Sequence, residues 1–235
     1  MFQTLSFLAG SLVTGIVFLL IFARLIRKEE NIDALLISLF ALFEGMAYLM
    51  ITGGVTADYL GVGGMNAMVS FQQVSNLLGG IATLFLFLFS LSISTDRMKN
   101  PLITVAPTAV TVAYIFATCH LPWTLVPIEG TLVKAVSEQM VTVTLLTRLP
   151  LLLCVIGLFA YHLAKSPASY RKVRLSLSLL ITGVSLFTLF TVVLEATGLL
   201  PGLAWLWYLV TTLSAIIIYW GFDIPRRLLD RLPEF

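Results

Sequence analysis

Long apolar stretches separated by short polar connections run through almost the whole chain. Seven of these stretches approach or exceed the roughly 20 residues that an α-helix needs to cross the hydrocarbon core of a bilayer. We expect membrane spans at 5–26, 33–53, 70–94, 101–120, 140–164, 174–196 and 203–222. The pattern therefore predicts an all-α fold, a polytopic membrane protein that forms one seven-transmembrane-helix bundle over residues 1–235.

The longest connection, residues 121–139, follows the fourth span. It contains Pro122, Trp123, Pro127 and Gly130, and proline and glycine are typical of turns. We expect its first half to be turn-like. Its second half is either part of the connection or an early start of the fifth helix.

The composition indicates that lipid surrounds much of the protein. Of the 235 residues, 59% are hydrophobic and 11% are charged, whereas soluble domains usually carry about a quarter charged residues. A soluble fold this apolar could not cover its own surface with polar groups. The net charge is only +2, and basic and aromatic residues do not alternate along a polar face. We therefore expect membrane lipids, and not nucleic acid, as partners.

The basic residues divide the connections into two sets. Twelve of the fourteen Lys and Arg residues fall in the connections that follow the first, third, fifth and seventh spans, whereas the other connections hold only Lys134. Basic residues favour the cytoplasmic side. The split predicts an N-terminus outside and a C-terminus in the cytoplasm. Residues 1–11 contain no Lys or Arg, so we expect the first span to be an uncleaved helix and not a signal peptide.

Two charged residues fall inside predicted spans. Glu44 lies near the middle of the second span, and Arg148 lies about eight residues from the outer end of the fifth. A charge at the bilayer centre costs at least about 2.5 kcal/mol, and pairing is the usual relief. We expect Arg148 to pair with Glu44, or else with Glu195 near the outer end of the sixth span. A structural ion pair and a ligand or proton site are both open readings, and we expect Pro150 to free a backbone carbonyl acceptor beside Arg148.

Other polar residues occur at a similar depth in several spans. At helical spacing each set shares one face of its helix, and most members fall in the outer half of the bilayer. The sequence therefore predicts a polar ligand-binding pocket that opens outward, while the apolar inner halves close the bundle. The alternative is hydrogen bonding between helices without a ligand. The predicted pocket residues are Glu44, Tyr48, Gln72, Asn76, Thr144, Arg148, Thr191 and Glu195.

Candidate catalytic and cofactor chemistry is sparse. His120 and His162 belong to opposite ends of the bundle, which disfavours a haem or metal site between them. The seventh span has no lysine, which excludes a retinal Schiff base at that place. Neither a Ser/His/Asp set nor a pair of catalytic carboxylates is present. We expect no cofactor, no metal and no enzymatic activity.

Two local features resemble a known family. The run FATCHLPW at 116–123 follows the fourth span, and a tryptophan-rich seventh span leads into Ile224-Pro225-Arg226-Arg227. With the seven-span pattern, these features are similar to the membrane sensor region at the N-terminus of some prokaryotic histidine kinases. The resemblance implies a protein of a prokaryotic plasma (inner) membrane. Because the chain stops at Phe235, where such a kinase continues, the signal would pass to a partner.

The leading functional hypothesis is a non-catalytic, sensor-like or small-ligand-binding membrane protein that acts through a membrane or cytoplasmic protein partner. The alternative is an accessory or structural subunit of a larger membrane complex, in contact with lipid, quinone or neighbouring helices. A small transporter that uses Glu44 and Arg148 comes third, because repeats or broken helices in matching positions are missing from the sequence. An enzyme comes last.

The predicted orientation is tested with topology reporters. A reporter fused after Phe235 should be cytoplasmic, and a tag at Gly63 in the connection after the second span should be external, because twelve of the fourteen basic residues favour that arrangement. Protease protection in spheroplasts measures both. A cytoplasmic tag at Gly63 would contradict the number of spans.

Overall fold

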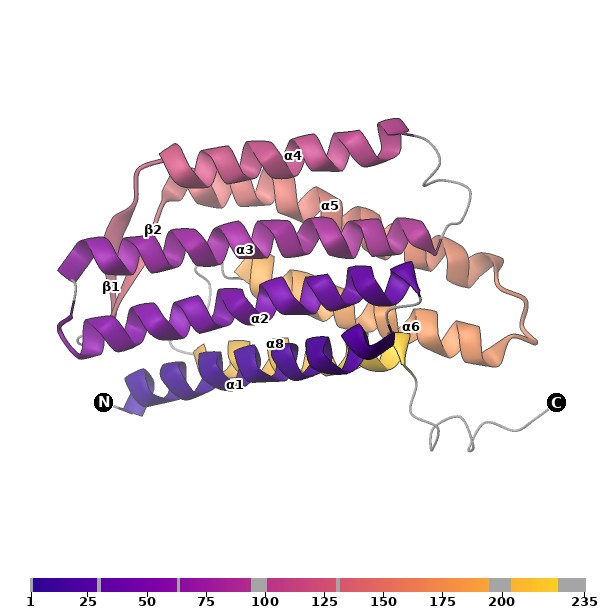
Figure 1. The fold of residues 1–235 in the computed structure, drawn as a ribbon, viewed down its shortest axis with the longest axis horizontal. Helices are drawn as coiled ribbons and strands as arrows, with labels where there is room; N and C mark the ends of the chain where they lie inside the picture. The colour runs from indigo at the N-terminus through magenta and orange to yellow at the C-terminus, as the bar shows by residue number, and fades with distance from the viewer. Residues whose placement is uncertain are drawn as a thin grey trace.

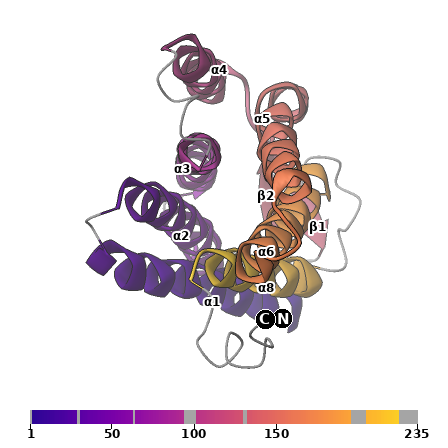
Figure 2. The ribbon, with the colours of Figure 1, turned by 90° about the vertical axis from the view of Figure 1, so that its right-hand side faces the viewer.

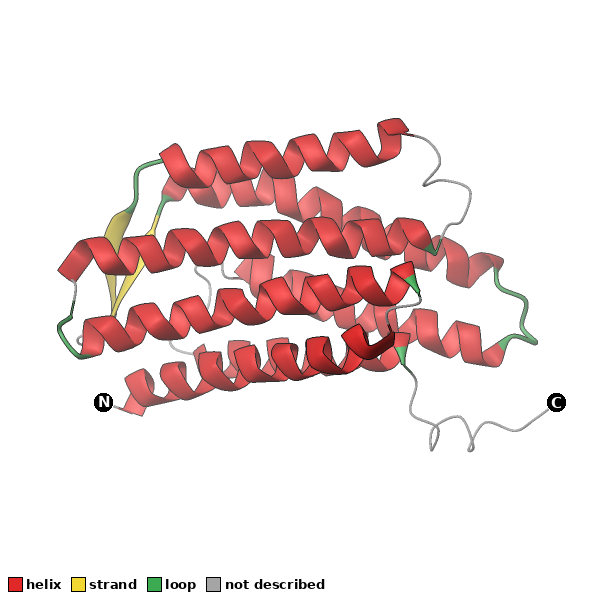
Figure 3. Ribbon diagram, viewed as in Figure 1, coloured by secondary structure: helices red, strands yellow, loops and turns green. Residues whose placement is uncertain are grey.

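The computed structural model describes residues 2–28, 31–62, 64–93, 101–129, 132–194 and 204–223. Within these ranges the chain forms seven α-helices, a 3₁₀ turn, a π-helical segment and one two-stranded hairpin (Figures 1 and 3). The α-helices are α1 (Phe2–Leu25), α2 (Ile32–Tyr59), α3 (Gly64–Ser92), α4 (Pro101–His120), α5 (Glu138–Lys165), α6 (Arg171–Phe187) and α8 (Ala204–Phe222). The shorter elements are the 3₁₀ turn η1 (Ile26–Lys28), the strands β1 (Thr124–Glu129) and β2 (Leu132–Val136), and the π-helix η2 (Thr188–Leu194).

Each of the seven predicted spans coincides with a helix, so the helical fold class is confirmed. Helices α2 and α3 are both longer than predicted at the ends that face each other. Gly53 and Gly54 do not end α2. A Cβ atom at either position would lie about 3 Å from the Phe71 side chain, at 3.1 Å and 3.0 Å respectively. These glycines therefore let α2 and α3 approach closely, and the turn comes later, at Gly61, whose φ of +65° favours glycine.

The connection between α4 and α5 differs from the prediction. Instead of a turn-like half and an early helix, β1 and β2 pair as an antiparallel hairpin (Figure 3). Their sequences, TLVPIE and LVKAV, are rich in the apolar and β-branched residues that favour strands. Pro127 is compatible with this pairing because both strands are edges, and the register is irregular between Pro127 and Glu129. Helix α5 begins only at Glu138, where the Ser137 hydroxyl accepts a bond from the Met140 amide.

Six helices surround a common interior, and the seventh lies outside them. Neighbours pack in the order α1, α2, α3, α5, α6 and α8, and α8 packs again on α1. Helix α4 packs on α3 and α5 at the periphery of this ring (Figure 2). A side chain that joins α2 to α5 must therefore cross the interior, because these two helices do not pack along their length.

The two ends of the bundle differ. One end carries the α1–α2 and α5–α6 connections, with Arg24, Arg27, Lys165, Arg171 and Lys172, and is called the basic end below. The other end carries the hairpin and the α2–α3 connection, and is called the hairpin end (Figure 1).

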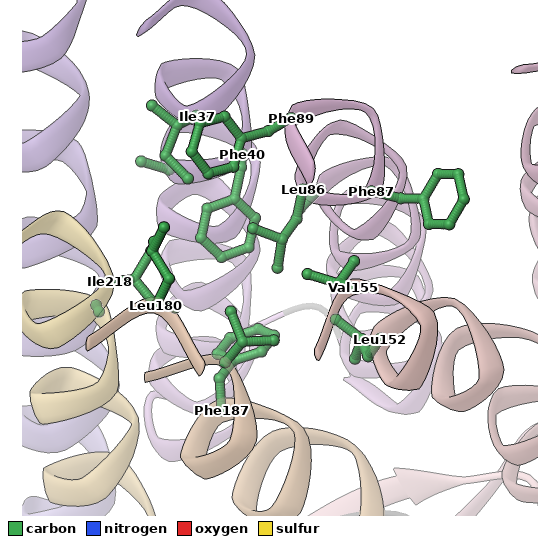
Figure 4. Close-up of a cluster of buried hydrophobic side chains, with 14 of the residues drawn as sticks. Ile37, Phe40, Leu86, Phe87, Phe89, Leu152, Val155, Leu180, Phe187 and Ile218 are labelled. Carbon is green, nitrogen blue, oxygen red and sulfur yellow. The ribbon is translucent and has the colours of Figure 1, made fainter. Parts of the chain in front are cut away.

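The interior toward the basic end is apolar. Phe40, Leu86, Leu152 and Phe187 come from four helices and belong to one buried cluster (Figure 4). The rings of Phe40 on α2 and Phe187 on α6 meet edge to face, with centroids 5.7 Å apart. This cluster fills the space between α2, α3, α5 and α6 on that side.

The outer surface suits a lipid environment. Six helices are long and apolar enough to cross a membrane, and α8 is apolar over Leu206–Phe222 but shorter. Large apolar side chains such as Leu20, Phe116 and Leu146 point outward and are exposed. The chain is thus a helical membrane protein, with these side chains placed to contact acyl chains.

Close packing between α6 and α8 depends on Gly183. A Cβ atom there would lie 2.7 Å from the Ile218 side chain and 2.9 Å from its backbone nitrogen. Gly183→Ala should therefore cost about 1–3 kcal/mol through overpacking, measured as a lower melting temperature in detergent. The control is Gly157→Ala on α5, where no atom lies within 4 Å, and it should be neutral or slightly stabilising. Equal effects at both positions would contradict the packing.

Candidate functional site

A buried ion pair crosses the interior of the bundle. Nη2 of Arg148 on α5 lies 3.4 Å from Oε1 of Glu44 on α2, and the two side chains are only 7% and 3% exposed. Arg148 is ten residues into α5, about 15 Å from its hairpin end at 1.5 Å per residue. The structure therefore confirms that these two residues pair. Among the described residues they are the only buried acid and base.

Helix α3 provides the space and the orientation for the guanidinium group. A Cβ atom on Gly79 would lie 3.1 Å from Nη1 and 3.2 Å from Nη2 of Arg148, so the absence of a side chain there admits the group. Nε of Arg148 donates to the Thr83 hydroxyl at 3.1 Å, and that hydroxyl donates to the Gly79 carbonyl at 2.9 Å. Arg148 is thus held by α2 and α3 together.

Tyr114 on α4 completes the surroundings of Arg148. Its ring centroid lies 5.9 Å from the guanidinium carbon, within cation–π range. The ring occupies the space above Gly80, where a Cβ atom would lie 2.6 Å from it. Consecutive glycines of α3 therefore accept side chains from two different helices. Four helices, α2, α3, α4 and α5, converge on one guanidinium group.

A hydrogen-bonded chain leads from Tyr114 toward the hairpin end. The Tyr114 hydroxyl donates to Oδ1 of Asn76 at 3.3 Å, and Nδ2 of Asn76 donates to the Gln72 carbonyl at 3.0 Å. Two of the predicted pocket residues, Asn76 and Gln72, are thereby connected to Arg148 through Tyr114. The Gln72 contribution comes from its backbone, and its side chain is half-buried.

Tyr114 was not among the residues predicted from the sequence, although a signal for it exists. Thr111, Tyr114 and Thr118 follow one another at helical spacing and are all buried, whereas the opposite face of α4 is exposed. A mainly polar stripe on one face of an otherwise apolar span indicates the side that packs on protein. Thr83 lies on α3 one turn beyond Gly79 and was likewise absent from the predicted set.

Tyr48 and Thr191 belong to a second group, nearer α8. The Tyr48 ring stacks on Phe18, with centroids 5.9 Å apart, and packs edge to face against Tyr208 at 6.1 Å. The Thr191 hydroxyl lies 3.4 Å from that of Thr211. This second group includes hydrogen bonding between helices, the alternative that the sequence left open. Tyr48 follows Glu44 by one turn, so α2 contributes to both groups.

The remaining predicted residues are placed as follows. Thr144 is half-buried on α5, one turn before Arg148. Glu195 lies outside the described residues. Pro150 and Leu146 are both exposed on α5, while Arg148 faces the interior from the opposite side of the helix. Positions 146 and 150 share the outer face, and the free carbonyl acceptor expected beside Arg148 stays a prediction.

The sixth predicted span is not a uniform α-helix. Helix α6 ends at Phe187 and continues as the π-helix η2 through Leu194. Segments of π-helix often occur at functional sites because the wider turn alters where side chains point. The segment carries Thr188 and Thr191, both buried. Within the described part of the chain, no group of three or more His, Cys, Asp or Glu residues could hold a metal ion.

Comparison with known proteins does not assign the chain to a family, because no protein-family model and no curated protein matches it. Fold and site together define a helical membrane protein with a buried arginine–glutamate pair at the meeting point of four helices.

The energetic role of the pair is tested by a double-mutant cycle. Breaking one partner of a buried pair typically costs about 3–5 kcal/mol, because it leaves an uncompensated charge. Arg148→Leu and Glu44→Leu should each lower the melting temperature in detergent, and the double variant should recover part of the loss. Glu138→Leu on exposed Glu138 is the control. Strictly additive losses would contradict coupling between Arg148 and Glu44.

Proposed function

We propose that this protein is a non-catalytic, sensor-like membrane receptor that binds a small ligand at Arg148. The observation that supports this most is the Arg148–Glu44 pair, which joins two helices across the interior. Ionisable residues inside membrane spans are functional candidates by default. Stability alone is a weak reason for such a pair, because replacing buried ion pairs by apolar residues is often neutral or stabilising.

The orientation in this proposal places the basic end in the cytoplasm and the N-terminus outside. The support is the accumulation of Arg24, Arg27, Lys165, Arg171 and Lys172 at one end. The ligand would then reach Arg148 from the outer half of the bilayer, as the predicted pocket requires. The apolar cluster around Phe40 and Leu152 would block passage to the cytoplasm, which favours a receptor over a transporter.

Contacts at the basic end provide a route for transmitting a shift of α5. Arg174 at the start of α6 donates to the Ser166 carbonyl at 2.9 Å and to the Leu163 carbonyl at 3.3 Å, which ties the end of α5 to α6. The Ser176 hydroxyl on α6 donates to the Gly221 carbonyl on α8. A ligand that changes how α5 is held by α2 would thereby also move α6 and α8. Helix α8 leads toward the C-terminus, where a membrane or cytoplasmic protein partner would receive the signal.

The accessory-subunit reading is the second candidate. Its support is helix α4, which lies outside the ring and exposes Val105, Val112 and Phe116. Such a surface is suited to a neighbouring chain as well as to lipid. The resemblance to prokaryotic sensor regions favours the receptor, and with it a plasma (inner) membrane location.

Native mass spectrometry of the protein purified in mild detergent separates the two candidates. We expect a bound non-lipid small molecule with the wild-type chain, lost in Arg148→Gln because the main cationic contact is removed. Lys172→Gln is the control, since Lys172 is exposed at the basic end and should leave binding intact. A stoichiometric membrane complex, with no small molecule that depends on Arg148, would contradict the receptor and support the subunit.

A further inference from the structure

We propose that the ligand of the Arg148 site is a monocarboxylate, which takes the place of Glu44 on the guanidinium group while Glu44 takes up a proton. This inference rests on the receptor function proposed above and specifies its ligand class. The geometry of the existing pair is the starting point. Nη2 and Oε1 are 3.4 Å apart, whereas charge-assisted bonds of this kind are usually about 2.7–2.9 Å long. The bond between Nη2 and Oε1 is thus longer than the usual length.

The surroundings of the guanidinium group favour a planar anion that approaches in the plane of the group. The guanidinium atoms pack against Gly79, Cζ lies over the Tyr114 ring, and Nε donates to Thr83. An anion that displaces Glu44 would meet the Nη atoms, and Arg binds carboxylates there with two parallel hydrogen bonds. Shorter bonds to an external carboxylate would offset the loss of the internal one.

Charge balance determines what accompanies the anion. Arg148 and Glu44 neutralise each other, so a bound anion would leave an extra negative charge in a site away from water, at a cost of several kcal/mol. In the described parts of the elements packed on α2, the cations lie toward the two ends of the bundle. The described part of α3 has no Asp, Glu, Lys, Arg or His, and Arg24 on α1 and Arg27 in η1 lie at the basic end. Strand β2, which carries Lys134, meets α2 toward the hairpin end (Figure 1).

The other titratable groups nearby are phenols. Tyr48 lies one turn from Glu44, Tyr208 packs on Tyr48, and Tyr114 packs on Arg148. None of these supplies a positive charge. A proton from water, bound to a carboxylate oxygen of Glu44, restores neutrality. Each binding event therefore takes up one anion and one proton and leaves the site with no net charge, whereas a dianion such as a phosphate ester would need two protons.

The exchange has a structural consequence. With a monocarboxylate on Arg148 and a neutral Glu44, the charged connection between α2 and α5 is absent. Helix α5 keeps its contacts with α3 and α4 through Thr83 and Tyr114. Ligand binding thus releases α2 from α5 selectively, which is the event that the proposed receptor would transmit.

The test uses trifluoroacetate as the probe, observed by ¹⁹F NMR with the full chain in detergent. Trifluoroacetate stays ionised across the working pH range, and uncharged trifluoroacetamide controls for partition into micelles. Saturable binding of trifluoroacetate should weaken by about tenfold for each unit of rising pH, because one proton is taken up per anion. Trifluoroacetamide should show no saturable binding. This series needs no variant, so its outcome does not depend on the folding of a mutant.

Three variants sharpen the result. Glu44→Gln resembles the protonated side chain, so binding should become tighter and independent of pH. Arg148→Gln should abolish binding, and Lys172→Gln, which removes an exposed positive charge at the basic end, should behave like the wild-type chain. The proposal is overturned if wild type and Arg148→Gln bind trifluoroacetate equally, if neither wild type nor Glu44→Gln binds it, or if wild-type binding does not change with pH. In each case a co-purified small molecule whose binding depends on Arg148 would still support the receptor function. Failure of the monocarboxylate proposal is therefore distinguishable from failure of the receptor proposal.

Discussion

A guanidinium group in the middle of a membrane-spanning bundle needs a counter-charge and hydrogen-bond acceptors from the protein itself. Much of this architecture depends on how the protein supplies them to Arg148. Its charge is balanced by Glu44 across the interior, its Nε donates to Thr83, and its Cζ lies 5.9 Å from the ring centroid of Tyr114. These contacts need α2, α3 and α4 at fixed distances from α5. The two adjacent glycines of α3 make those distances possible, since a methyl group at either would meet a side chain from another helix.

The interior is divided by this pair into two parts with different properties. Toward the basic end, apolar side chains from α2, α3, α5 and α6 pack together without a buried charge among the described residues (Figure 4). Toward the hairpin end, Asn76 and Gln72 extend the polar contacts of Tyr114. A change at Arg148 would therefore act between the apolar side chains packed around Phe40 and Leu152 and the polar contacts of Tyr114. That position suits a receptor whose signal leaves through the basic end.

The hydropathy pattern was sufficient for the seven helices, and it limited the expected partners of Arg148 to Glu44 and Glu195, because transfer of apolar and charged groups into lipid dominates both. The pairing with Glu44 came from the structure. The pattern was insufficient where strand pairing and packing between helices determine the structure. The hairpin at 124–136 lies in a connection. Its strands, TLVPIE and LVKAV, are apolar but too short to span a membrane, so the hydropathy pattern does not distinguish them. Tyr114 was missed because an aromatic residue in an apolar span resembles a lipid-facing one until its neighbours are known. Whether the predicted residues form one pocket stays a prediction, with Glu195 outside the described residues.

The central claim is that the Arg148–Glu44 pair holds α2 and α5 in position relative to each other. The most direct measurement is the distance between two spin labels by double electron–electron resonance. The labels are placed at positions 32 and 164, which are exposed at the basic ends of α2 and α5. Cys119 and Cys154, both free and exposed, would first be replaced by serine. The doubly labelled wild-type protein should give one narrow distance distribution, and Glu44→Gln should broaden or shift that distribution. Identical distributions in the two proteins would contradict the claim.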